Sequence, residues 1–153
     1  MLELFFFILG LLNNIFLIFI FLVRKTHKMA TLQRIGVGYL LLAIPAVYGI
    51  FLVVQEQKAV QYGIFLGIFL TYLALEWVYD FILKIPFRQN WKLLTPYLCL
   101  YFAMNYGFVV MVWKTSLLGG LLMLGLFIIQ IIVNLSTHHP KSKDKAPKSA
   151  VSD

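Results

Sequence analysis

Two acidic residues are unusual because they lie inside a long apolar stretch of the sequence. Glu76 and Asp80 are four residues apart, so on a helix they project from one face, one turn apart. A carboxylate at membrane depth is costly unless it is paired, protonated or hydrated, and such residues commonly serve a function. Glu76 is therefore a candidate proton- or cation-binding group; the alternative is an internal hydrogen bond or ion pair that fixes helix packing. For Asp80, pairing with Lys84 or Arg88 is the simpler interpretation.

Polar side chains also recur at helical spacing in other apolar stretches. Tyr97, Tyr101 and Asn105 follow an i, i+4, i+8 pattern and therefore share one helix face. Gln130 and the adjacent pair Asn13-Asn14 lie in two further stretches. We expect these groups to converge with the carboxylates on a polar pocket in the cytoplasmic half of a helix bundle; interhelical hydrogen bonding is the alternative use. The candidate ligand- or proton-binding residues are Glu76, Asp80, Tyr97, Tyr101, Asn105, Gln130 and Asn13.

A short basic connection forms a second candidate site. Lys84, Arg88 and Lys92 are interleaved there with aromatic residues that include Trp91. Cations beside an interfacial tryptophan can bind anionic lipid headgroups or a phosphate. These four residues are therefore candidate headgroup-binding residues, and the alternative is that the segment only sets the membrane topology.

Small residues form a stripe in the stretch that contains Glu76. Gly63, Gly67 and Thr71 follow a small-xxx-small-xxx-small pattern, which allows another helix to approach closely, either within the chain or in a second subunit. At about 100° per residue, the two carboxylates project from the opposite side of the helix. Because neither face suits lipid, we expect this helix to lie centrally in the bundle.

The sequence lacks the residues that common catalytic and cofactor sites need. It contains no Walker motif, Gly-x-Ser-x-Gly, His-Glu-x-x-His or Cys-x-x-Cys, and no histidine lies within an apolar stretch to bind haem. The pair His138-His139 is too small a ligand set for a metal, and the single Cys99 cannot form an intrachain disulfide. We therefore expect no metal and no cofactor, and the sequence disfavours a conventional hydrolase or redox enzyme.

The composition requires these residues to be positioned by membrane-spanning helices. Of the 153 residues, 61% are hydrophobic and only 12% are charged, against roughly 45–50% and 25% in soluble domains, and the mean hydropathy is +0.88. An apolar helix of about 20 residues crosses the bilayer core. The sequence predicts an all-α, polytopic membrane protein with five transmembrane helices, over residues 4–23, 35–54, 59–83, 93–113 and 116–135.

The basic residues predict the orientation of this bundle. Eleven of the thirteen lysines and arginines fall in the first connection, the third connection and the tail, whereas Lys58 and Lys114 alone lie on the other side. The positive-inside rule then places the N-terminus outside and the C-terminus in the cytoplasm of a multi-pass protein of the cell membrane. This clustering between apolar stretches also explains the net charge of +7 without a nucleic-acid partner.

The two ends of the chain differ in character. Before the first apolar stretch the sequence carries Glu3 instead of a positive charge, and Arg24 follows the stretch where a signal peptide would have a cleavage site. We therefore expect a retained helix. Residues 136–153 are polar and lysine-rich, which predicts a disordered, basic cytoplasmic tail.

Three functions are compatible with these features. The sequence favours a small integral membrane protein that binds or transports a small molecule, ion or lipid through the polar pocket. One alternative is a structural or accessory subunit of a larger membrane complex. Another is a lipid-modifying enzyme that uses Glu76 and Asp80 with a metal. The expected partners are membrane lipids and either further copies of the chain or the subunits of such a complex.

Overall fold

The protein is a bundle of apolar helices. In the computed structural model, the described residues are 1–25, 29–83 and 90–137. Within these ranges the chain is helical and has no strand; the elements are α1 (Leu2–Lys25), α2 (Met29–Leu40), α3 (Ala43–Gln55), α4 (Val60–Trp77), the π-helix η1 (Val78–Ile82), α5 (Trp91–Trp113) and α6 (Leu117–Thr137). The helices long and apolar enough to span a membrane cover Leu2–Arg24, Ala30–Gln55, Val60–Ile82, Trp91–Trp113 and Leu117–Ser136.

These five spans confirm the predicted all-α, five-helix membrane fold. The second span begins earlier than predicted, because α2 starts at Met29 and its first turns are more polar than the apolar stretch that marked the span in the sequence. The orientation of the bundle in the membrane stays a prediction. The predicted tail lies outside the described residues, apart from residues 136 and 137, which are the last two residues of α6.

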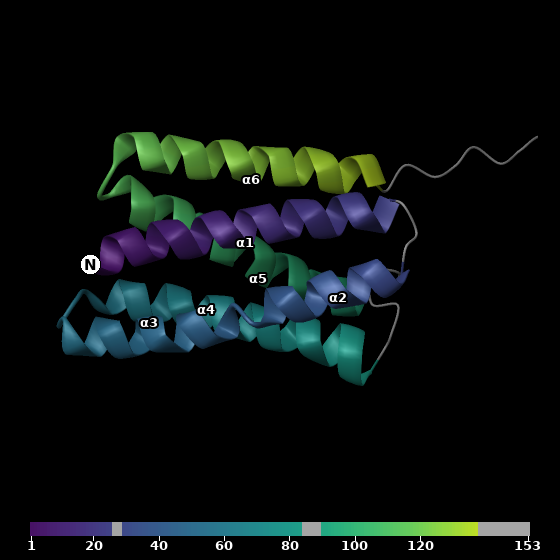
Figure 1. The fold of residues 1–153 in the computed structure, drawn as a ribbon, viewed down its shortest axis with the longest axis horizontal. Helices are drawn as coiled ribbons and strands as arrows, with labels where there is room; N and C mark the ends of the chain where they lie inside the picture. The colour runs from purple at the N-terminus through teal and green to yellow at the C-terminus, as the bar shows by residue number, and fades with distance from the viewer. Residues whose placement is uncertain (26–28, 84–89, 138–153) are drawn as a thin grey trace, which may run out of the picture.

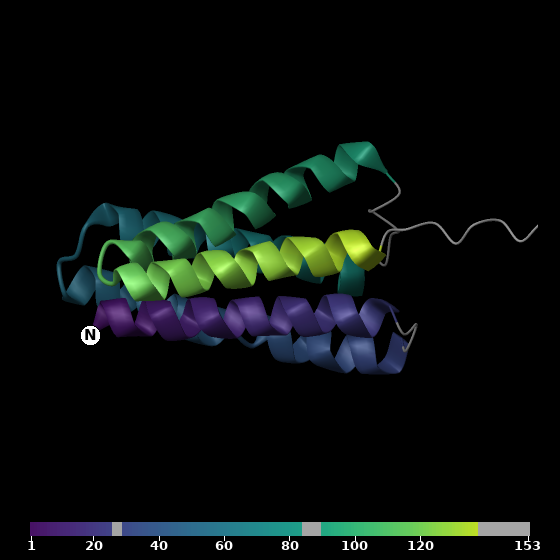
Figure 2. The same cartoon turned by 90° about the horizontal axis from the view of Figure 1, so that it is seen from above.

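Helix α1 occupies the centre of the bundle. It lies beside α6 in both views (Figures 1 and 2) and also contacts α2, α3 and α5. Of the five spans, the span formed by α1 has the largest fraction of residues buried inside the bundle. The helix expected at the centre, α4, instead packs between α3 and α5. The sequence prediction of a central third span was therefore wrong, because α1 and not α4 contacts helices on several sides.

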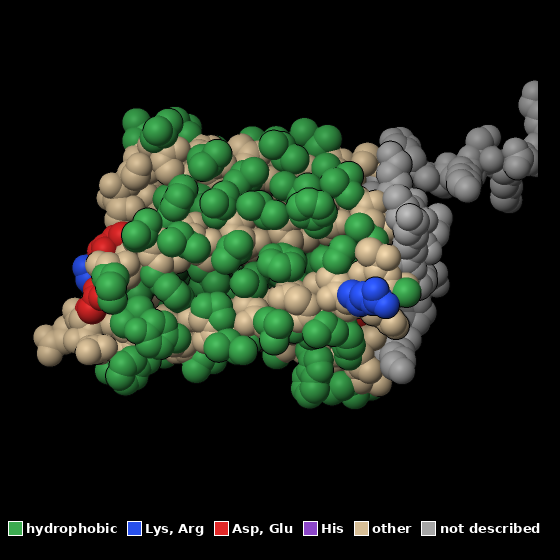
Figure 3. Space-filling model, viewed as in Figure 1, with side chains coloured by type: hydrophobic (Ala, Val, Ile, Leu, Met, Phe, Trp, Pro, Cys, Tyr) green, Lys and Arg blue, Asp and Glu red, His purple; other side chains and the backbone are tan. Residues whose placement is uncertain are grey.

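The surface is apolar over its middle and charged at its ends. On the face drawn in Figure 3, hydrophobic side chains cover the length of the bundle, and acidic and basic side chains lie at its two extremities. Large apolar residues such as Leu12, Phe19, Ile64 and Ile132 are exposed. Such a surface is stable against lipid and unstable against water.

Pro45 interrupts the second span. It has no N–H group to donate to the carbonyl of Leu41, and that carbonyl accepts a bond from the N–H of Ile44 at 3.1 Å instead. Helix α2 consequently ends at Leu40 and α3 begins at Ala43. The break leaves Tyr39, in the last turn of α2, buried against the bundle interior.

The third span ends in a widened turn. In η1 the N–H of Leu83 bonds to the carbonyl of Val78 at 2.9 Å, an i to i+5 bond. This π-helix changes the direction in which side chains leave the helix after Trp77, since each turn contains more residues than an α-helical turn. Tyr79 is buried there, whereas Asp80 is exposed.

Close helix contacts predict opposite outcomes for two glycine substitutions. A Cβ on Gly107 would lie 2.7 Å from Cγ of Phe65, whereas a Cβ on Gly67 would meet nothing within 4 Å. We expect Gly107→Ala to destabilise the bundle by about 1–3 kcal/mol through overpacking, visible as a lower Tm in mild detergent. Gly67→Ala should keep or raise the Tm, since alanine favours a helix. Equal losses of Tm in both variants would contradict this packing.

Candidate functional site

The carboxyl group of Glu76 lies in the interior of the bundle. Its side chain is only 6% exposed, although it is ionisable. It lies near the phenol groups of Tyr39 and Tyr72. Helix α4 carries Glu76 and Tyr72 one turn apart on its buried face, and α2 carries Tyr39.

Four buried tyrosines surround this region and are called here the tyrosine cluster: Tyr39, Tyr72, Tyr97 and Tyr101. The hydroxyl groups of Tyr72 and Tyr97 form a hydrogen bond of 2.7 Å between α4 and α5. The ring of Tyr72 has its centroid 5.2 Å from that of Tyr97, 6.3 Å from that of Tyr101 and 6.5 Å from that of Tyr39. Tyr72 is thus the common neighbour of the other three tyrosines, although it was not among the predicted site residues.

A chain of hydrogen bonds connects the tyrosine cluster to α6 and α1. The hydroxyl of Tyr101 donates to Oε1 of Gln130 at 2.8 Å, and Nε2 of Gln130 donates to Oδ1 of Asn14. Asn14 in turn donates through Nδ2 to the carbonyl of Gly10 at 2.7 Å. Because these side chains are buried, the chain links three helices without help from solvent.

A second connection joins α2 to α1. The hydroxyl of Tyr39 donates to Oδ1 of Asn13 at 2.8 Å. The two neighbouring asparagines of α1 therefore bond in different directions, Asn13 toward α2 and Asn14 toward α6. Adjacent residues of a helix point about 100° apart, which suits a central helix with partners on several sides.

Two buried amide atoms have no hydrogen-bond partner among the described residues. They are Nδ2 of Asn13 and Oδ1 of Asn105, in side chains that are 0% and 1% exposed. The amide nitrogen of Asn105 is satisfied, since it donates to the carbonyl of Tyr101 at 2.9 Å. An unsatisfied buried polar atom costs about 1–3 kcal/mol, so both atoms are available to a water molecule or a polar ligand.

The structure brings most of the predicted polar residues together but separates Asp80 from them. Glu76, Tyr97, Tyr101 and Gln130 lie in the connected interior region, together with the two asparagines just described. Asp80 lies outside it, exposed beside Arg34. The two predicted carboxylates therefore differ in environment, because Glu76 is buried in α4 whereas Asp80 is exposed in η1, one turn nearer the end of the bundle.

Sequence reasoning also missed two members of the tyrosine cluster. Tyr72 lies four residues before Glu76, so the same i, i+4 rule would have found it. Tyr39 has no polar neighbour at helical spacing in its own span. It joins the cluster only through the packing of α2 against α1 and α4, for which the sequence offers no signal.

The candidate headgroup site is described only in part. Lys84 and Arg88 lie outside the described residues. Trp91 is 73% exposed at the start of α5, and Lys92 is exposed beside it, with its backbone N–H bonded to the side chain of the N-cap residue Asn90. An exposed tryptophan at a helix end suits the membrane interface, and headgroup binding stays a prediction.

The small-residue stripe lies on the outer side of α4. Thr71 is exposed and donates to the carbonyl of Gly67 in its own helix at 2.8 Å. No atom of the described chain comes within 4 Å of a Cβ placed on Gly67, and Val53 comes only to 3.9 Å at Gly63. The close helix approach predicted for this stripe is not made within the described part of the chain.

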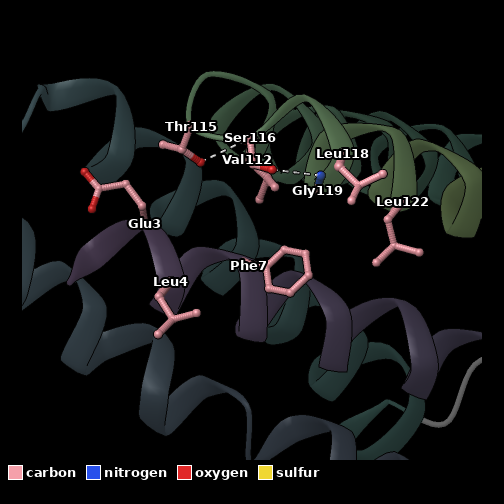
Figure 4. A pocket seen from close by; sticks show the side chains of 9 residues that line it. All are labelled: Glu3, Leu4, Phe7, Val112, Thr115, Ser116, Leu118, Gly119 and Leu122. Carbon is pink, nitrogen blue, oxygen red and sulfur yellow. Dashed lines mark hydrogen bonds between the residues drawn. The ribbon is translucent and has the colours of Figure 1, made fainter.

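A hollow of about 350 Å³ lies at the opposite end of the bundle, between α1 and the α5–α6 turn (Figure 4). Phe7 and Leu122 line it, and Glu3 lies at its rim. Glu3 is not free to bind a ligand, because its carboxylate pairs with Nζ of Lys58 at 2.7 Å and with the N-terminal ammonium at 3.5 Å. The hydrogen bond to Glu3 raises the pKa of Lys58 above its usual value.

The interior region, rather than this hollow, has the chemistry of a binding site. It combines one carboxyl group with phenol and amide groups that can donate and accept hydrogen bonds. Comparison with known protein families, curated proteins and solved structures finds no match to this chain. A function is therefore inferred from the arrangement of these groups alone.

The hydrogen-bond chain predicts that Gln130→Leu destabilises the bundle. The substitution leaves the Tyr101 hydroxyl and Oδ1 of Asn14 without Gln130 as a partner, at a cost of about 0.5–2 kcal/mol. Gln61→Leu is the matched control, because Gln61 bonds to Lys114 at an exposed end of the bundle. Thermal unfolding in mild detergent should show a lower Tm for the first variant only. An unchanged Tm for Gln130→Leu would show that these bonds do not hold the helices.

Proposed function

We propose that this protein is a small integral membrane protein that binds or transports a small molecule, an ion or a lipid through the polar region around Glu76. The observation that carries this proposal is a buried carboxyl group, 6% exposed, within the tyrosine cluster. We also propose the cell membrane as its location, on the basis of its basic connections.

The energetics of the carboxyl group support a functional role. Hydrogen bonds between tyrosine and amide side chains already join α1, α2, α4, α5 and α6 without a charge. An ionisable group adds a desolvation cost that an uncharged glutamine of the same shape would avoid. A carboxyl group retained at this depth is therefore best explained by a proton or ligand that it binds.

The chemistry of the region favours particular solutes. Carboxylate, phenol and amide oxygens coordinate hard cations and accept hydrogen bonds from ammonium groups. The faces of tyrosine rings also attract cations. A proton, a metal cation or a small molecule with a positive charge therefore fits better than an anion, which the charge of Glu76 would repel.

Glu76→Gln tests the proposal because it removes the charge and keeps the shape. We expect the wild-type protein, purified in mild detergent, to retain a bound molecule in native mass spectrometry, and Glu76→Gln to lose it at an unchanged Tm. Glu56→Gln is the matched control at the α3–α4 turn, outside the polar region. It should behave as wild type.

A second measurement covers solutes that are too weakly bound to survive purification. Proteoliposomes with an imposed pH gradient and an enclosed pH-sensitive dye report proton movement, alone or with added sodium, potassium or tetraethylammonium ions. We expect movement in the wild type and in Glu56→Gln, and none in Glu76→Gln. Identical adducts and identical fluxes in all three proteins would contradict a binding role for Glu76.

A role as an accessory subunit is the second candidate, and one observation favours it. The stripe of Gly63, Gly67 and Thr71 faces outward and leaves open space at Gly67, which would suit a helix of another subunit or of a second copy. A stoichiometric companion protein after purification in mild detergent would support this role. The lipid-modifying alternative has less support, because it needs Glu76 and Asp80 in one site.

A further inference from the structure

A groove of about 530 Å³ lies between α2 and η1, at the end of the bundle where η1 stops. It is lined by Ala30, Gln33, Arg34, Val37, Asp80 and Phe81. The ring of Phe81 lies 3.4 Å from the position that a Cβ on Gly36 would take. The two elements are therefore in contact beside the groove, and its walls belong to well-defined helices rather than to loops.

Among the described residues that line the groove, one is a cation and one is an anion, and both are accessible. Arg34 projects from α2 and Asp80 from the widened turn of η1, and both side chains are exposed. Neither forms an ion pair or a hydrogen bond with another side chain in the described ranges. Both charges are thus able to bind a ligand that lies between them.

Apolar residues continue from the two charges toward the middle of the membrane. Val37 in α2 and Leu41 just after its end follow Arg34 at helical spacing on the same face, and both are exposed. On the other wall, the aromatic ring of Phe81 lines the groove next to Asp80. The groove consequently offers charge at its outer end and apolar surface deeper in the bilayer, which is the polarity of a phospholipid.

Both charges also lie at interfacial depth. Arg34 is five residues from the start of α2 and Asp80 two residues from the end of η1, which corresponds to roughly 3–8 Å along each helix. Arg34 and Asp80 are therefore at the level where lipid phosphates and the groups attached to them reside.

From this geometry we propose that the groove binds a phospholipid whose headgroup carries a phosphate and a primary ammonium group, with the phosphate at Arg34 and the ammonium at Asp80. A guanidinium group forms paired hydrogen bonds to phosphate oxygens. A primary ammonium group donates three hydrogen bonds, which a carboxylate accepts. The acyl chains then lie along Val37, Leu41 and the ring of Phe81.

This pairing discriminates between common headgroups. A choline headgroup has a cation without N–H groups, so it cannot donate a hydrogen bond to Asp80. A glycerol headgroup has no cation, and its net negative charge is repelled by Asp80. Phosphatidylethanolamine should therefore bind in preference to phosphatidylcholine and phosphatidylglycerol with the same acyl chains. The site does not involve Glu76, so its failure would leave the proposed function untouched.

Competition among the three lipids tests the proposal directly. The protein is purified in mild detergent, mixed with equal amounts of the three lipids with identical chains, and analysed by native mass spectrometry, which separates them by mass. We expect phosphatidylethanolamine to be enriched about threefold or more over each of the others. Arg34→Gln and Asp80→Asn should each remove this enrichment, and Asp80→Asn should raise the share of phosphatidylglycerol.

Matched controls lie at the opposite end of the bundle. Lys114→Gln and Glu56→Gln make the same chemical changes outside the groove and should retain the enrichment. Thermal unfolding should show that all four variants are folded, since the altered groups are not part of the buried core. Equal binding of the three lipids by the wild type would overturn the proposal. So would enrichment that survives in Arg34→Gln and Asp80→Asn, or that disappears in a control variant.

Discussion

Within a bilayer, helices gain little by burying apolar side chains against each other, because lipid chains are equally apolar. Hydrogen bonds between polar side chains are then a principal source of specific association, and here they converge on α1. Asn13 and Asn14 direct one bond toward α2 and another toward α6. Further hydrogen bonds extend this network: α5 is bonded to α6 through Tyr101, and α4 is bonded to α5 through Tyr72.

The same constraint explains why the candidate site and the structural framework share residues. Tyr101 and Gln130 hold helices together, yet they also border the region that contains Glu76. A bundle whose polar groups only fixed helix positions would need no ionisable group among them. Glu76 is the ionisable member of this region, and it is the residue to which we propose a binding role.

Sequence patterns were sufficient to predict the spans and most of the interior polar residues. Both depend on local properties of the sequence, namely the length of an apolar stretch and the helical spacing of polar residues. Helical periodicity brought Tyr97, Tyr101 and Asn105 to one face, as expected. It did not predict the burial of each residue on a face: Glu76 is buried, whereas Asp80, one turn nearer the end of the bundle, is exposed. It also failed for the stripe at Gly67, where the pattern indicates that a helix can approach but not which helix does so. Only tertiary packing could assign Tyr39.

The break at Leu41 and Leu42 divides the second span into two helices, α2 and α3. Helix α2 carries two side chains that face in different directions. Arg34 faces the outer groove, and Tyr39 faces the interior. Because both residues belong to α2, a rigid-body movement of this helix moves Arg34 and Tyr39 together. Any tilt of α2 would therefore displace the groove surface at Arg34 and the wall of the polar interior at Tyr39 together.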